Sequence, residues 1–348
     1  MRLKTFLQIS DIHISDGSYE DRSVKLYASL PKLDGFLGHS YNSLTKLQTF
    51  FADLAQDEGA EVIVTGDLTR VGAASEFKTA RDYLEREALI RGKFIGLNDA
   101  KSLTLAVPGN HDHYPGVPFL FGGPTPGLGQ TFPNPLPPIT ISLGHGYELT
   151  VLRINTDADV SAWGVKRARA VGSFVSQLNW LKGQLGRQRE KEIRILLLHH
   201  SIAHRGATLE IDGPSRDELV NFIVDFGVAV LLSGHIHQPP LVRLATAVHT
   251  VTNQKSAEYL EARCGTTTQR NLFHIPYYWR NILVKPGLMK RGHWSNTLLV
   301  HRISKEANEI FWESELFMEE PNEFKPAKPS HLYCMVNPKV RIWPAPVK

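Results

Sequence analysis

The sequence has few cysteines and no long apolar run, and each shortage excludes a class of protein. Its 348 residues include only two cysteines, Cys264 and Cys334, which lie far apart and form no CxxC pair. A chain of this length buries enough surface to fold without disulfides. Because its two cysteines are far apart and unpaired in sequence, we expect a reducing compartment. No stretch approaches the roughly 18 uninterrupted apolar residues of a membrane-spanning helix.

Signals for secretion and for nucleic-acid binding are also missing. Residues 1–11 lack the apolar core and small-residue cleavage site of a signal peptide and are typical of a first strand. We therefore expect a soluble, cytoplasmic protein. The net charge of +4 suits an anionic small-molecule substrate. The sequence has no run of five or more basic residues, so a nucleic-acid partner is not indicated. The hydrophobic periodicity does not identify an oligomeric interface.

What is present is an alternation of short apolar runs and helical patterns, which is typical of βαβ units. Apolar residues at three-to-four spacing predict a helix over 44–56, with Gly59 to end it. Ser75 is expected to cap the next helix, and Ser215 with Glu218 forms a capping box that opens another. A further helix is predicted over 177–188, and strands over 61–65, 103–107, 193–198 and 228–232.

Two hairpins stand apart from this alternation and predict antiparallel strands. One pairs 139–143 with 147–154, and the other pairs 297–303 with 309–317. The mixture predicts an α/β fold, a two-sheet β-sandwich flanked by helices. We expect one domain over 1–318 and a Pro-rich C-terminal extension over 319–348. Within the domain, the Pro/Gly-rich stretch 115–138 is expected to be an irregular surface loop.

A polar cluster follows each of five predicted strands. The clusters are Asp11-Ile12-His13, Gly66-Asp67, Gly109-Asn110-His111-Asp112, His199-His200 and Gly234-His235-Ile236-His237. Ligands bind at the carboxyl ends of the strands in α/β sheets, so the five clusters can converge on one site. Each motif alone is a weak signal, and their conjunction in this order carries the prediction.

The residue types in these clusters indicate a metal site. Carboxylate, imidazole and amide oxygen together form a mixed nitrogen and oxygen ligand set, which suits Mn, Fe, Zn, Ni or Co. The set is too large for one ion, and an aspartate can bridge two. A pair of metals about 3.5–4 Å apart can activate a bridging water and clamp the attacking and leaving oxygens of an in-line displacement.

The motif series resembles that of the calcineurin-like metallophosphoesterase superfamily. The resemblance covers residues 11–237, and the segments after Gly66 and Gly109 look most like the bacterial cyclic-nucleotide phosphodiesterase branch. It implies the family's four-layer sandwich and two metal ions. By resemblance, Asp11, His13, Asp67 and His237 would hold one metal, and Asp67 would bridge to a second held by Asn110, His199 and His235.

Further roles follow from the same resemblance. His111 would stand off the metals, near the leaving oxygen, as general acid or transition-state stabiliser. Asp112 would either orient His111 or cap the following turn. Relatives often have His-His-Pro-Pro where this chain has His199-His200-Ser201-Ile202. We choose His199 as the ligand and keep His200 as a substrate contact.

Two more residues are candidate substrate contacts. His204 lies close to the fourth motif, and Arg70 follows Asp67. Both could reach an anionic substrate. For Arg70, an exposed position at the start of a helix is the favoured interpretation.

The predicted activity is hydrolysis of a phosphodiester by a metal-bridging hydroxide, with cyclic nucleotides as the substrate class that the resemblance most suggests. A phosphomonoesterase or phosphatase is the first alternative. It is disfavoured because Leu68-Thr69-Arg70 replaces the Asp-Arg-Gly expected there. A nucleotide-pyrophosphate hydrolase is the second alternative. The third is a binding protein on a phosphoesterase fold, which the complete ligand set disfavours.

Overall fold

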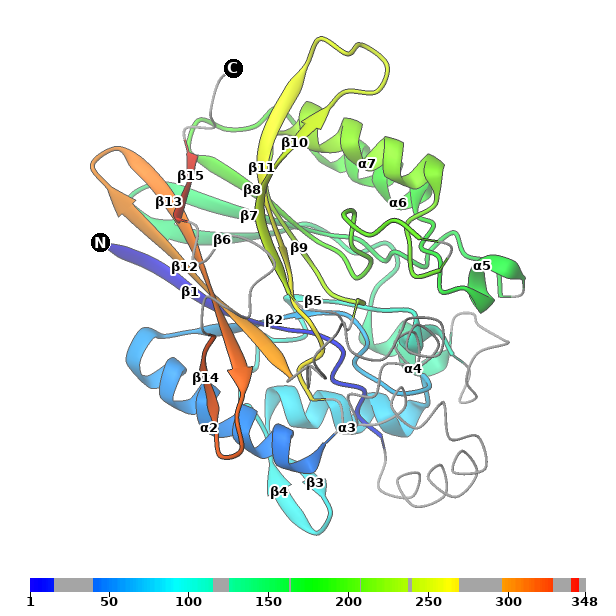
Figure 1. The fold of residues 1–348 in the computed structure, drawn as a ribbon, viewed down its shortest axis with the longest axis vertical. Helices are drawn as coiled ribbons and strands as arrows, with labels where there is room; N and C mark the ends of the chain where they lie inside the picture. Colours follow the sequence, from blue (N-terminus) through cyan, green and yellow to red (C-terminus); the bar gives the residue numbers. More distant parts are fainter. Residues whose placement is uncertain are drawn as a thin grey trace, which may run out of the picture.

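Two β-sheets lie face to face, and helices cover their outer faces (Figure 1). This computed structural model describes residues 1–15, 40–114, 125–162, 164–206, 208–236, 240–268, 296–327 and 339–343. The arrangement confirms the predicted α/β sandwich.

The first sheet has the strand order β14-β13-β12-β1-β2-β5, and β15 also pairs with β13. Its strands are β1 (Arg2–Ile9), β2 (Glu61–Thr65), β5 (Ala106–Val107), β12 (Thr297–Glu306), β13 (Glu309–Glu319), β14 (Phe324–Pro326) and β15 (Lys339–Trp343). β1, β2 and β5 run parallel, whereas β12 is antiparallel to β1. The carboxyl ends of three motif-bearing strands therefore meet at one edge.

The second sheet has the order β10-β11-β9-β8-β7-β6. Its strands are β6 (Ile139–Gly144), β7 (Tyr147–Arg153), β8 (Glu192–Leu197), β9 (Val228–Ser233), β10 (Leu241–Val248) and β11 (Ser256–Arg263). β7, β8, β9 and β11 run parallel. The two remaining motifs follow β8 and β9, so they emerge at the carboxyl edge of this sheet.

Four longer helices follow the predicted pattern with shifted ends. They are α2 (Tyr41–Glu58), α3 (Ala74–Glu85), α6 (Val175–Gln184) and α7 (Gly213–Phe226). Gly59 ends α2 in the left-handed conformation that glycine tolerates, as predicted. Both predicted N-caps are wrong by a few residues. The N-cap of α3 is Ala73, and that of α7 is Asp212, whose side chain accepts from the Ser215 amide.

The N-cap of α7 differs from the predicted residue because the Ser215 hydroxyl has another hydrogen-bond partner. Its hydroxyl accepts from the Phe174 amide at 2.9 Å and so ties the start of α7 to the start of α6. Asp212 is an equally good cap and carries a charge that the helix N-terminus favours. Local sequence alone could not distinguish the two capping residues.

Smaller elements complete the fold. They are the hairpin β3 (Ala88–Ile90) and β4 (Lys93–Ile95), the 3-10 turn η2 (His111–His113), and the short helices α4 (Pro126–Thr131) and α5 (Val165–Ala168). The stretch 115–138 is not irregular throughout, because α4 lies within it. Residues 115–124 lie outside the described residues. Within 319–348, β14 and β15 pair with β13.

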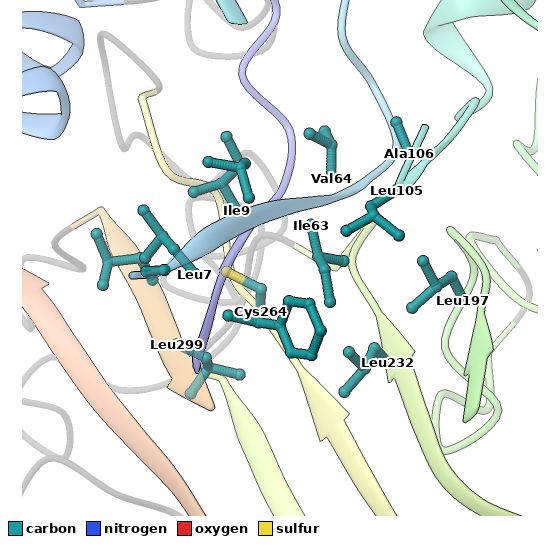
Figure 2. Close-up of a cluster of buried hydrophobic side chains, with 14 of the residues drawn as sticks. Leu7, Ile9, Ile63, Val64, Leu105, Ala106, Leu197, Leu232, Cys264 and Leu299 are labelled. Atoms are coloured by element: carbon teal, nitrogen blue, oxygen red, sulfur yellow. The ribbon is translucent and has the colours of Figure 1, made fainter. Parts of the chain in front are cut away.

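The main core fills the space between the two sheets. Figure 2 shows Leu7 and Ile63 of the first sheet on one side and Leu197 and Leu232 of the second on the other. Cys264, a free and buried thiol, packs among them. A second cluster lies between the second sheet and helices α6 and α7. These two close-packed hydrophobic clusters hold the strand ends in fixed positions, and the predicted motifs with them.

Among the described residues, none of the helices is both long and apolar enough to cross a membrane.

Candidate metal centre

Predicted ligands from both sheets gather where their parallel strands end. The first sheet supplies Asp11 and His13 after β1, Asp67 after β2 and Asn110 after β5. The second sheet supplies His199 after β8 and His235 after β9. All six are buried. His237, the seventh predicted ligand, lies outside the described residues.

Asp67 belongs to two groups of side chains that can each hold a metal ion. One group is His13, Asp67 and His111, and the other is Asp67, His199 and His235. Within each group one ligand atom per residue lies within 4.8 Å of the others. Asp67 Oδ2 is 3.9 Å from His13 Nε2 and 3.3 Å from His199 Nε2. One carboxylate oxygen of Asp67 therefore lies near a ring nitrogen from each group.

The remaining predicted ligands border these groups. Asp11 Oδ1 lies 4.0 Å from His13 Nε2, and Asp11 Oδ2 accepts from the His235 amide at 3.1 Å. Asn110 Oδ1 lies 3.2 Å from His199 Nε2. His199 Nε2 is also 3.0 Å from His235 Nδ1. The six predicted ligands that the structure describes thus form one continuous cluster.

Four of these residues have the left-handed backbone that non-glycine residues rarely adopt. The φ angles are 54° at Asp11, 46° at His13, 53° at Asp67 and 67° at His235. Each such residue costs on the order of 1–3 kcal/mol, and such strain is concentrated at functional sites. The surrounding structure therefore stabilises a left-handed backbone that these four residues would rarely adopt in isolation.

Two glycines allow the clusters to approach so closely. At Gly66, where φ is +100°, a Cβ would lie 2.2 Å from His199 Nδ1. At Gly109 a Cβ would lie 2.2 Å from Asp67 Oδ1. Both contacts are far shorter than van der Waals distance, so these two positions require glycine.

The two histidines of the fourth motif differ in what their ring nitrogens contact. His199 Nδ1 lies 2.8 Å from the Thr65 carbonyl oxygen and must donate to it, which leaves Nε2 toward Asp67 and His235. In His200 both nitrogens are engaged, Nδ1 with Thr156 Oγ1 at 2.7 Å and Nε2 with the Ala170 carbonyl at 3.0 Å. Only His199 presents a nitrogen to the cluster.

His111 lies within one of the two ligand groups, although the resemblance places it off the metals. Its backbone amide donates to Asp67 Oδ1 at 2.9 Å, and its ring lies 4.5 Å from that of His13. His111 Nδ1 is 2.8 Å from the Arg70 carbonyl and donates to it. Nε2 is therefore the nitrogen that can carry a proton or bind a metal.

Asp112 holds the motif loops together. Its carboxylate accepts from the amides of Gly109, Leu68 and Thr69 and from the Thr69 hydroxyl, at 2.7–3.2 Å. Among the described residues, Asp112 makes no hydrogen bond to the His111 ring. Its contacts are those of a turn cap, the second of the two predicted roles.

Arg70 and His204 are placed differently from each other. Arg70 is buried, with Nε 3.7 Å from Glu76 Oε1, so the exposed helix-start interpretation is wrong. The Glu76 carboxylate also accepts from the Val71 amide at 2.8 Å. Glu76 is thereby held beside Arg70 in the interior. His204 is partly exposed, and its Nε2 contacts the Thr208 carbonyl at 3.0 Å.

The family model for calcineurin-like phosphoesterases matches residues 4–239. The chain belongs to this family. The match spans every predicted motif. No curated protein sequence gives a significant match.

Among solved structures, this family member is similar to the purple acid phosphatase PPD1 from seeds of yellow lupin (Lupinus luteus). The TM-score is 0.50 at 12% sequence identity, over 93% of this chain and 52% of the lupin chain. The chain therefore spans about half of the lupin protein's length. At this identity the likeness shows the shared fold alone.

The candidate metal residues of this family member fit a metal pair electrostatically. Burial raises the pKa of Asp67, but His199 and His111 outweigh this effect and hold the pKa well below its ordinary value. Burial lowers the pKa of His199, but Asp67 and Asp11 overcome this and raise it to about 10. The buried carboxylates thus favour positive charge between them. Together with the mixed nitrogen and oxygen donors, this is the environment of a cation site.

A polar cluster after β7 is not among the five predicted motifs. Asn155 Oδ1 lies 3.0 Å from His113 Nε2, Thr156 contacts His200, and Asp157 pairs with the buried Arg167. β7 was interpreted only as one arm of a hairpin, although it also runs parallel to β8. The rule that applied to the other five strands would have found this cluster.

A second missed group follows β11. Thr266 Oγ1 donates to the Asp11 carbonyl at 3.2 Å, and Thr268 Oγ1 donates to the Ile12 carbonyl at 2.8 Å. These hydroxyls fix the first motif from the second sheet. Three consecutive threonines after a strand were the available signal.

Proposed function

We propose that this chain is a two-metal phosphodiesterase and that cyclic nucleotides are the substrate class to test first. The observation that carries the proposal is the position of Asp67, shared between two ligand groups. We propose that the first metal is held by Asp11, His13, Asp67 and His237, and the second by Asp67, Asn110, His199 and His235. The metals are drawn from Mn, Fe, Zn, Ni and Co.

The chain's own residues would then position the reaction. A bound metal pair would supply Lewis acidity toward water and toward the phosphate oxygens. His199 is oriented by the Thr65 carbonyl, and this contact keeps its Nε2 toward the centre. His111 is oriented by the Arg70 carbonyl, so a proton on its Nε2 can pass to the leaving oxygen.

The charge around the motifs favours a diester over a monoester. A monoester carries a second negative charge, which phosphatases commonly neutralise with extra cations. Here two buried arginines near the motifs already have carboxylate partners: Arg70 lies beside Glu76, and Arg167 pairs with Asp157. His200 and His204 are also engaged with partners within the chain. We therefore propose that the site accepts a singly charged phosphate.

The test compares hydrolysis of bis-p-nitrophenyl phosphate and p-nitrophenyl phosphate by metal-stripped protein, before and after manganese is restored. Asp67→Asn removes the shared carboxylate charge. Asp53→Asn, at an exposed position of α2, makes the same chemical change elsewhere.

Manganese-dependent turnover that favours the diester, at least about a hundredfold lower in Asp67→Asn, supports the proposal. Asp53→Asn should match the unmodified protein. Preference for the monoester would overturn the phosphodiesterase assignment, and turnover unchanged in Asp67→Asn would overturn the bridging role.

A further inference from the structure

A pocket of about 390 Å³ lies beside α3, α4 and the end of β7, and no predicted metal-site residue lines it. Three arginines, Arg81, Arg86 and Arg153, contribute to its wall. Glu85 is the one carboxylate in that wall. Three guanidinium charges against one carboxylate leave the lining with a formal excess of positive charge.

Arg153 is the most unusual of the three because it is buried. Its side chain projects from the end of β7, and the residue is only 5% exposed. The guanidinium donates to the Pro137 carbonyl at 3.1 Å and to the Ala106 carbonyl at 3.5 Å. Its Nε atom has no hydrogen-bond partner among the described residues. A buried guanidinium held only by neutral carbonyls retains most of its charge for another ligand.

Arg81 and Arg86 bring two more guanidiniums to the same pocket from α3. Arg81 Nη2 donates to the Gln130 carbonyl at 3.2 Å and contacts Thr131 Oγ1 at 3.4 Å, which directs it along the pocket wall. Arg86, at the C-cap of α3, is exposed. Within the part of the chain that the structure describes, no ion pair links Arg81, Arg86 or Arg153 to a carboxylate. The three charges are therefore not neutralised there.

The remaining wall suits an organic anion. Thr104 and Thr131 add hydroxyl groups, while Leu103 and Pro133 add apolar surface. Guanidinium groups bind tetrahedral oxyanions through paired N–H donors, more strongly when one of them is desolvated. We propose that this pocket binds a small molecule that carries a phosphate or similar divalent oxyanion, at a site separate from the metal centre.

The position of Arg153 gives the ligand a connection to the chain's active region. Arg153 contacts the carbonyl of Ala106, and β5 leads from Ala106 into the loop that carries Asn110. An anion on Arg153 would compete for donors with that carbonyl. The same segment continues past Arg153 into Asn155, which contacts His113.

The first experiment soaks crystals of the manganese-loaded protein in tungstate and locates tungsten by its anomalous scattering. We expect one peak in the arginine pocket, beside Arg153, independent of any peak at the metal centre. The double variant Arg81→Gln with Arg86→Gln should lose the pocket peak and keep the other. The matched variant Lys93→Gln with Arg187→Gln removes two exposed charges outside the pocket and should keep both.

A peak at the metal centre with none in the pocket would overturn the proposal and leave the proposed function intact. A pocket peak without one at the metal centre supports the pocket alone, so the two proposals fail separately.

The second experiment measures binding in solution through thermal unfolding with sulfate or chloride at equal ionic strength. Sulfate also stabilises proteins generally, so the matched variant defines that background. We expect an apparent sulfate affinity at least about tenfold weaker in the Arg81/Arg86 double variant than in the Lys93/Arg187 variant. Equal stabilisation of the two variants by sulfate would overturn the proposal.

Discussion

Asp67 and His199 come from different sheets, yet Asp67 Oδ2 lies 3.3 Å from His199 Nε2. A buried glutamine joins the two sheets just behind them. Gln8 Nε2 donates to Thr65 Oγ1 at 3.1 Å in the first sheet and to the Ser233 carbonyl at 2.9 Å in the second. The distance between the two predicted ligands is therefore set by how the sheets pack, and several predictions test this dependence.

Substituting His199 and His200 separately should distinguish their roles. We expect His199→Gln to lose about one metal per chain and at least about a hundredfold in diesterase activity, because its Nε2 faces the cluster. His200→Gln should keep both metals and lose stability instead, since it breaks contacts to Thr156 and Ala170. Metal content by elemental analysis and urea unfolding measure these effects. Metal loss confined to His200→Gln would reverse the assignment.

Gly66→Ala should damage the centre without altering any ligand. The added Cβ would lie 2.2 Å from His199 Nδ1, at a φ of +100°. A displacement of the imidazole by about 1 Å can cost about a hundredfold in rate. We expect that loss together with weaker metal binding. Gly186→Ala, with nothing within 4 Å of its Cβ, should leave both unchanged. Full activity of Gly66→Ala would show that the loop adapts freely.

Tyr114→Phe tests whether Asn110 needs a partner to orient its amide. Asn110 Nδ2 donates to the Tyr114 hydroxyl at 3.3 Å, and this contact directs Oδ1 toward His199. A lost hydrogen bond of about 0.5–1.5 kcal/mol predicts a kcat about two- to tenfold lower, with metal content retained. Tyr83→Phe loses a similar buried contact, to the Leu44 carbonyl, and should lower stability but not kcat. Equal kcat in the two variants would contradict the positioning role.

His301 should make stability depend on pH. Burial, with a smaller contribution from Arg302, lowers the pKa of His301 to about 3, while the unfolded chain titrates near its ordinary 6.5. The unfolded state therefore binds a proton first as pH falls, so this stabilisation is present above about pH 6.5 and is lost between pH 6.5 and 3. Between pH 7 and 4.5 the loss is roughly 2–3 kcal/mol.

The measurement is the free energy of unfolding in urea at pH 7 and 4.5, on metal-stripped protein. His301→Gln should reduce the fall in stability by that amount, because it removes the buried imidazole between Gln8 and Ser314. His145→Gln, in an exposed turn, is the control. An identical fall in His301→Gln and the unmodified protein would rule out this source of acid sensitivity.

Local patterns were sufficient for most elements. The apolar run 61–65 coincides with β2, and the predicted hairpins match β6 with β7 and β12 with β13. Predicted ends were less accurate, since β5 retains only Ala106–Val107 of the strand expected over 103–107. Strand ends depend on which neighbour supplies hydrogen bonds, and β5 pairs with β2 over only two residues. That information is not local.

The sequence by itself determined which residues could bind metal, because carboxylate, imidazole and amide groups after apolar strands are chemical facts of the chain. Only the tertiary structure decided how they meet. It turned His199 rather than His200 toward Asp67, buried Arg70 beside Glu76, and brought Asn155 to His113. It also placed three arginines around one pocket from segments far apart in the chain. These outcomes depend on the packing of two sheets against each other, and no periodicity within one segment encodes that distance.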